Sequence, residues 1–142
     1  MAVLARSALR QRVAAAVGAL SGYDESRTPL SLFFRDPNTR RHGAFAVGVA
    51  ESVPLTRQNP SRAFLDTVID VAIGWKLKPK DQLASLDAAL DGQEAVSVAV
   101  LGMSLANVQI NLERVGAPVL NESGEWARVD LSFRAVHLCA VV

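Results

Sequence analysis

The chain of 142 residues contains one cysteine, few aromatic residues and almost no net charge. Because Cys139 is the single cysteine, no disulfide can form within the chain, which favours a reducing compartment. Fifteen Lys and Arg residues nearly balance fourteen Asp and Glu residues, so the formal net charge is +1. This balance excludes the broad basic surface of a dedicated nucleic-acid-binding protein, and we expect any contact with DNA to be local.

The sequence also lacks the long apolar runs of a membrane protein. No segment reaches the ~18–20 apolar residues of a membrane span. Arg6, Arg10 and Arg12 interrupt the first apolar stretch, which therefore does not match a signal peptide. Half of the residues are nevertheless hydrophobic, and the mean hydropathy of +0.21 is high for a small monomer. We therefore expect part of the surface to be buried between subunits.

Motifs that carry catalysis or bind cofactors are missing from the sequence. Its glycines occur singly and form no phosphate-binding loop, and no Ser/His/Asp order is distinctive. His137 and Cys139 lie two apart on one predicted strand, which could suggest a nucleophile with its base or two metal ligands. Their alternation places them on the apolar side with Leu131 and Phe133, so we interpret them as a hydrogen-bonded core histidine and a buried small side chain. The sequence predicts no enzyme, no metal site and no cofactor.

Residues 105–138 are predicted to form two long strands joined through the turn at 121–125. Apolar residues occupy even positions before the turn and odd positions after it, which is the two-residue period of a strand. One face is therefore apolar and the other polar, as in an antiparallel sheet that is covered on one side. The apolar positions are Val108, Ile110, Leu112, Val129, Leu131, Phe133 and Ala135.

The remaining pattern predicts helices and strands that complete a single domain over residues 1–142. Together they indicate an α+β fold in which two helices cover one face of a mostly antiparallel sheet. The expected helices are 3–20 and 81–90, the second ending at Gly92 with Leu83, Leu86 and Leu90 facing the sheet. The expected strands are about 45–50, 63–77 and, as a short strand or extended connection, 93–104. Residues 30–35 are expected to form a short strand or an extended arm, and loops are expected at about 23–43 and 51–62.

The polar face of the predicted sheet and the arginine-bearing loops are the candidate contact regions. Asp66 and Asp70 lie roughly 13 Å apart at strand rise, too far to share a proton or a metal, so we expect ion pairs with Arg128 or Arg134. The candidate residues for a subunit interface, partner interface or lumen are Asp66, Asp70, Asn107, Gln109, Asn111, Arg128, Asp130, Arg134 and the exposed Trp126. The candidate loop contacts are Arg40, Arg41, Arg57 and Arg62.

The order of segments resembles the tail terminator proteins of long-tailed bacteriophages, a group that includes the minor tail protein completing the tail tube of lambda-like phages. The resemblance covers most of the chain, except residues 20–42 and 93–104, which fit least well. Its clearest part is NVQINLERVGAPVLNESGEWARVDLSFRAV, a strand, an acidic turn, a tryptophan and a long final strand. The other matching segments are LARSALRQRVAAAVGAL, GAFAVGVA, FLDTVIDVAIGWKLKP and DQLASLDAAL.

The resemblance implies a structural virion protein, assembled in the host cytoplasm and located at the tail or neck. Such proteins form a ring, usually a hexamer, that caps the tail tube, stops its growth and binds the head-side connector. The implied partners are other copies of the chain, the major tail tube protein, the head completion protein and DNA passing through the lumen. Two alternatives are another head–tail joining protein and, in a different class, a small-ligand-binding α+β domain with a cavity between helices and sheet.

Overall fold

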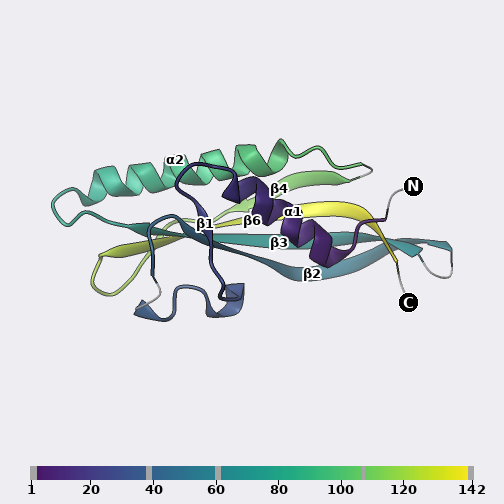
Figure 1. The fold of residues 1–142 in the computed structure, drawn as a ribbon, viewed down its shortest axis with the longest axis horizontal. Helices are drawn as coiled ribbons and strands as arrows, with labels where there is room; N and C mark the ends of the chain where they lie inside the picture. Colours follow the sequence, from purple (N-terminus) through teal and green to yellow (C-terminus); the bar gives the residue numbers. More distant parts are fainter. Residues whose placement is uncertain (1–2, 38–39, 60–61, 107, 141–142) are drawn as a thin grey trace.

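A computed structural model describes residues 3–37, 40–59, 62–106 and 108–140. Two helices cover one face of a mostly antiparallel sheet (Figure 1), which confirms the expected α+β fold. The first helix is shorter at both ends than the predicted range 3–20. The elements are α1 (Arg6–Gly18), β1 (Asp24–Glu25), the 3₁₀ helix η1 (Leu30–Leu32), β2 (Ala44–Asn59), β3 (Arg62–Lys76), α2 (Gln82–Leu101), β4 (Gln109–Val115), β5 (Val119–Leu120) and β6 (Trp126–Ala140).

The two longest uninterrupted partners, β3 and β6, form the centre of the sheet. The strand order is β1-β2-β3-β6-β4, β5 also pairs with β6, and the β1–β2 pair is parallel while the others are antiparallel. The pairing of β3 with β6 runs without a bulge from Arg62 opposite Ala140 to Lys76 opposite Trp126. The odd-numbered residues of both strands face the helices, as their alternation predicts. The buried core includes Leu9, Val13, Val17, Phe45, Ile69, Val71, Ile73, Val96, Val100, Val129, Leu131 and Phe133.

The loop predicted over 51–62 is wrong, because β2 continues to Asn59 and forms a long hairpin with β3 (Figure 1). Three register shifts, at Ala50, Leu55 and Gln58, interrupt the two-residue alternation that identifies a strand in a sequence. Pro54 adds a second misleading signal. Along this stretch β2 pairs with β3 on one side only among the described residues, and edge strands tolerate proline.

The second helix is also longer than predicted, since α2 passes through Gly92 and includes most of the segment expected as a strand. Gly92 lies on the buried side of α2, where a Cβ atom would overlap the indole ring of Trp75 and come within 2.6 Å of the Tyr23 hydroxyl. The glycine therefore allows close packing and does not end the helix. Val96 and Val100 are one helical turn apart and buried, whereas Val98 is exposed.

The prediction that Leu83, Leu86 and Leu90 face the sheet is wrong for two of the three leucines. Leu83 and Leu90 are exposed, and Leu86 is half-buried. The side of α2 that packs on the sheet is formed instead by smaller residues and one glutamine, namely Ala89, Gly92, Gln93, Val96 and Val100. The helix thus has apolar residues on both its buried and its exposed sides.

The first half of the predicted C-terminal hairpin is divided in two. A register shift between Leu112 and Arg114 ends the alternation, and residues 116–118 separate β4 from β5. Buried Gln93 of α2 stabilises the backbone at this interruption. Its side-chain amide donates hydrogen bonds to the carbonyls of Gly116, at 2.9 Å, and Asp130, at 2.7 Å. The helix, the interrupted strand and β6 are therefore connected at one point.

The opposite face of the sheet is covered at one end by the segment 26–37 (Figure 1). Residues 30–35, expected as a short strand or an extended arm, do not form a strand, since Leu30–Leu32 is a 3₁₀ helix and Phe34 has a positive φ of 70°. Phe33 packs on the small residues Ala44, Ala46 and Ala72, with Leu30 and Phe34 at the margin of the cluster. A short apolar run alone does not distinguish a strand from such a cover.

Candidate interaction surface

The uncovered part of the polar sheet face is organised around Arg134. This side chain connects three strands, because it donates to Asp66 of β3 at 2.8 Å and to Glu113 of β4 at 2.6 Å. These bonds, the Glu113 bond first and the Asp66 bond second, raise the pKa of Arg134 above its ordinary value. The ion pair expected between Asp66 and an arginine is therefore present. Glu113, its second acceptor, was not among the predicted site residues.

Only one carboxylate oxygen of Asp66 accepts a hydrogen bond from the described residues. Its Oδ2 atom accepts from Arg134, while its Oδ1 atom is buried and receives no hydrogen bond from the described residues. Asp70 does not pair with Arg128 and instead accepts a 2.6 Å hydrogen bond from the Ser132 hydroxyl. Gln109 and Asn111 lie exposed on the same face, opposite Val136 and Arg134 of β6. Among the described residues, the uncovered polar face thus presents carboxylates, amides and two guanidinium groups, those of Arg134 and of exposed Arg114, which lies opposite Ser132.

Arg128, Asp130 and Trp126 lie at the covered end and are engaged within the subunit. Arg128 donates to the Asp130 carboxylate at 2.9 Å and to the carbonyl of Phe33 at 3.4 Å, and its guanidinium lies 5.9 Å from the centre of the Phe33 ring. Trp126 is half-buried and meets Phe34 edge to face at 5.6 Å. These contacts hold the segment 26–37 on the sheet, and the expectation that Trp126 is an exposed aromatic residue is wrong.

The predicted loop contacts divide into three cases. Arg40 folds back onto its own loop and donates a hydrogen bond to the carbonyl of Phe34 at 3.1 Å. Its guanidinium lies 5.2 Å from the centre of the Phe34 ring. Arg41 borders an open hollow. The side chains of Arg57 and Arg62, like all of Asn107, lie outside the described part of the structure, so their roles stay predictions.

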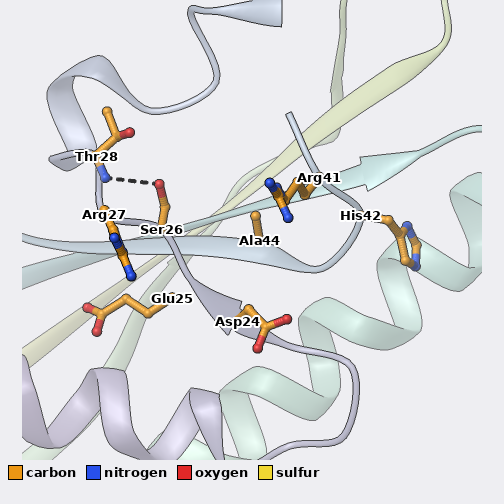
Figure 2. A pocket seen from close by; sticks show the side chains of 8 residues that line it. All are labelled: Asp24, Glu25, Ser26, Arg27, Thr28, Arg41, His42 and Ala44. Carbon is orange, nitrogen blue, oxygen red and sulfur yellow. Dashed lines mark hydrogen bonds between the residues drawn. The ribbon is translucent and has the colours of Figure 1, made fainter. Parts of the chain in front are cut away.

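Figure 2 shows this hollow, which has a volume of about 530 Å³ and mixed charge. Its lining residues are Asp24, Glu25, Ser26, Arg27, Thr28, Arg41, His42 and Ala44. Glu25 pairs with Arg10 of α1 at 3.0 Å. His42 accepts a 3.1 Å hydrogen bond from the Lys76 backbone N–H at Nδ1 and contacts Trp75 edge to face, and burial lowers its pKa. His42 therefore anchors the loop as a neutral ring.

His137 is a core histidine, as its alternation predicts. Its ring is fully buried, with Nε2 2.7 Å from the Thr67 hydroxyl and Nδ1 2.8 Å from the carbonyl of Leu4. The Thr67 hydroxyl in turn lies 2.9 Å from that of Ser52. Cys139 is half-buried, so its expected full burial is wrong. His137 and Thr67 are both fully buried, so their hydrogen bonds connect strands inside the core.

Sequence reasoning missed exposed apolar side chains in two places, the outer side of α2 and the β4–β5 edge. Leu83 and Val98 are 78% and 71% exposed, which is unusual for large apolar side chains on one helix. On the sheet edge, Val115, Val119 and Leu120 are also exposed. The signal was present in the sequence as an α2 segment that is apolar on more than one side.

The fold and surfaces define a class, an α+β domain with a polar sheet face and a helix that exposes large apolar side chains. No protein-family model and no curated protein sequence matches the chain. Among the described residues, no helix combines the length and apolar character needed to cross a membrane.

Proposed function

We propose that this chain is a structural virion protein that forms a ring at the end of a bacteriophage tail tube. The ring stops tube polymerisation and joins the tail to the head-side connector, and DNA passes through its lumen. The observation that carries the proposal is the number of exposed apolar side chains on the outer side of α2 and at the β4–β5 edge. Large apolar patches on a small domain are typical of surfaces that become buried in an assembly.

The uncovered polar face of the sheet suits the lumen of such a ring. Arg134 is balanced by Asp66 and Glu113, and the neighbouring Gln109 and Asn111 are neutral. A strongly basic lumen would bind DNA phosphates and release counterions, which would retain the genome. A balanced, hydrated surface lets the DNA pass. The partners in this proposal are further copies of the chain, the major tail tube protein and the head completion protein.

The alternative of a small-ligand-binding domain has less support. Such a domain would hold its cavity between helices and sheet. In the described structure, side chains of α1 and α2 pack there in one buried cluster with those of β3 and β6. The hollow of Figure 2 lies beside β1 and the loop before β2, and it is open to solvent.

The test is to remove the protein from the virus that encodes it and to image the products by electron microscopy. Tails that are longer than normal and carry no heads are the expected result, with normal length restored by the wild-type protein supplied in trans. Tails of normal length that fail to join heads would assign the chain to the other head–tail joining proteins. Normal particles with joined heads would contradict both roles.

A further inference from the structure

The outer side of α2 carries a regular stripe in which apolar and acidic residues alternate. Its members follow the three- and four-residue spacing of one helix face. Besides Leu83 and Val98, the apolar members Leu90 and Leu101 are each 41% exposed, and both acidic members are exposed. The stripe consists of Leu83, Asp87, Leu90, Glu94, Val98 and Leu101.

The two helices have opposite charges. α2 contains Asp87, Asp91 and Glu94 and no basic residue, whereas α1 contains three arginines and no acidic residue. Within the described residues, none of the three α2 carboxylates forms an ion pair. On α1, Arg10 is paired with Glu25, while Arg6 and Arg12 are exposed and form no ion pair with the described residues.

The outer side of α1 combines Arg12 with small side chains. Around Arg12 it exposes small residues, Ala15 and Ala19, together with Gln11. A helix face of small residues lets a neighbouring backbone approach closely, so bulky side chains from another helix can pack across it. The stripe on α2 supplies such side chains, and its carboxylates supply the charge that Arg12 lacks within the subunit.

We infer that the α2 stripe of one copy packs against the Arg12 face of α1 in the next copy. Within one subunit the two helices contact each other through their inner sides. These sides bury Val13, Val17, Val96 and Val100 in the shared core, so the α2 stripe and the Arg12 face do not contact each other within one subunit. A contact between two different surfaces of identical chains is heterologous, and it closes into a ring when the rotation allows. This inference rests on the proposed ring and names the interface that would build it.

The test is a charge exchange between the two helices, with assembly measured by sedimentation velocity over a range of protein concentrations. Glu94→Arg and Arg12→Glu each place like charges across the contact. Each single variant is expected to need a roughly tenfold higher concentration for half-assembly. The double variant restores opposite charges and is expected to recover most of the loss.

Three controls make the result specific to this pair of faces. Glu122→Arg reverses a charge in the turn before β6 and is expected to assemble like the wild type. Leu83→Ser removes an exposed apolar side chain of the stripe and is expected to weaken assembly without changing thermal unfolding of the monomer. Circular dichroism of all variants checks that each one folds.

The possible outcomes test the proposed ring and the proposed interface separately. If the wild type assembles and Glu94→Arg and Leu83→Ser assemble equally well, the ring stands and this interface is wrong. If both single charge variants fail and the double variant does not recover, the pairing of α2 with α1 is wrong. If the wild type remains monomeric at every concentration, the proposed ring fails and this interface fails with it.

Discussion

His137 is part of a chain of hydrogen bonds that links four segments far apart in the sequence. The carbonyl of Leu4 can only accept, so Nδ1 of His137 carries the proton and donates. In the neutral ring Nε2 then accepts from the Thr67 hydroxyl, whose oxygen accepts from Ser52. The N-terminal segment, β3 and β2 are thereby tied to the end of β6. Protonation of His137 would remove the acceptor on which this order depends.

We predict that His137 makes the folded state sensitive to acid. Burial lowers the pKa of His137 below its usual 6.5, and nearby Arg6 lowers it further, although the bond to Leu4 opposes this. The unfolded chain therefore takes up a proton at a higher pH than the folded chain. The stabilisation is fully present above pH 6.5 and is lost as the pH falls below it, by at most about 1.4 kcal/mol per pH unit.

The measurement is urea unfolding from pH 7.5 to pH 5, with His137→Gln as the comparison. Glutamine can donate to the Leu4 carbonyl and accept from Thr67 but does not titrate in this range. The difference in unfolding free energy between wild type and variant should shrink as the pH falls. A difference that stays constant with pH would show that folding does not shift the pKa of His137.

The length of α2 and the side that it buries could not be predicted from the spacing of its apolar residues. Leucines at 83, 86 and 90 have the same spacing as the residues that contact the sheet, so periodicity alone offers two possible faces. Which of the two faces packs on the sheet depends on the size of its side chains. Small residues on the inner side, Ala89 and Gly92, allow α2 to approach Trp75 and Tyr23, whose rings meet edge to face at 6.2 Å.

We predict that Gly92→Ala destabilises the protein although alanine is the better helix former. The favourable change in helix propensity is about 1 kcal/mol, while overpacking of a filled site costs about 1–3 kcal/mol. Because the added methyl group would overlap the Trp75 indole, we expect a net loss of up to about 2 kcal/mol in unfolding free energy, measured by urea denaturation.

Gly18→Ala in α1 is the matched control for this substitution. A Cβ atom at Gly18 would lie 3.7 Å from the Phe45 ring, an ordinary contact distance. This variant is expected to be as stable as the wild type or more stable by up to about 1 kcal/mol. If Gly92→Ala is also stabilised, the close packing of α2 on Trp75 is wrong.

Across the molecule the near-zero net charge hides a separation of charge between the helices. The three arginines of α1 and the three acidic residues of α2 cancel in the total of +1. On the other side of the sheet the charges are interleaved, as around Arg134. Separated charges on the helix layer suit contacts between copies, and interleaved charges suit a surface that meets solvent or DNA.

We predict that the purified chain forms one discrete closed assembly of identical subunits, with six copies as the resemblance to tail terminators implies. Native mass spectrometry at increasing concentration measures the number of copies directly. Because charged side chains contribute to the proposed contact, assembly should weaken at about 1 M salt, where the Debye length falls to about 3 Å. A continuous series of sizes would indicate an open polymer and contradict the ring.

The sequence by itself determined the centre of the fold. Strands β3 and β6 each have one buried face, so alternation along them specifies the core side, the polar side and the place of His137. The same alternation placed Asp66 and Arg134 on one face, where they form an ion pair. These features follow from a period that one strand displays alone.

Only the tertiary structure decided the parts in which local patterns allow more than one solution. The extension of β2 depends on its pairing with β3, and the cover of Phe33 depends on small residues at Ala46 and Ala72. The buried side of α2 depends on how closely its backbone approaches Trp75. In each case the deciding quantity is the space between segments distant in the sequence, which no local period records.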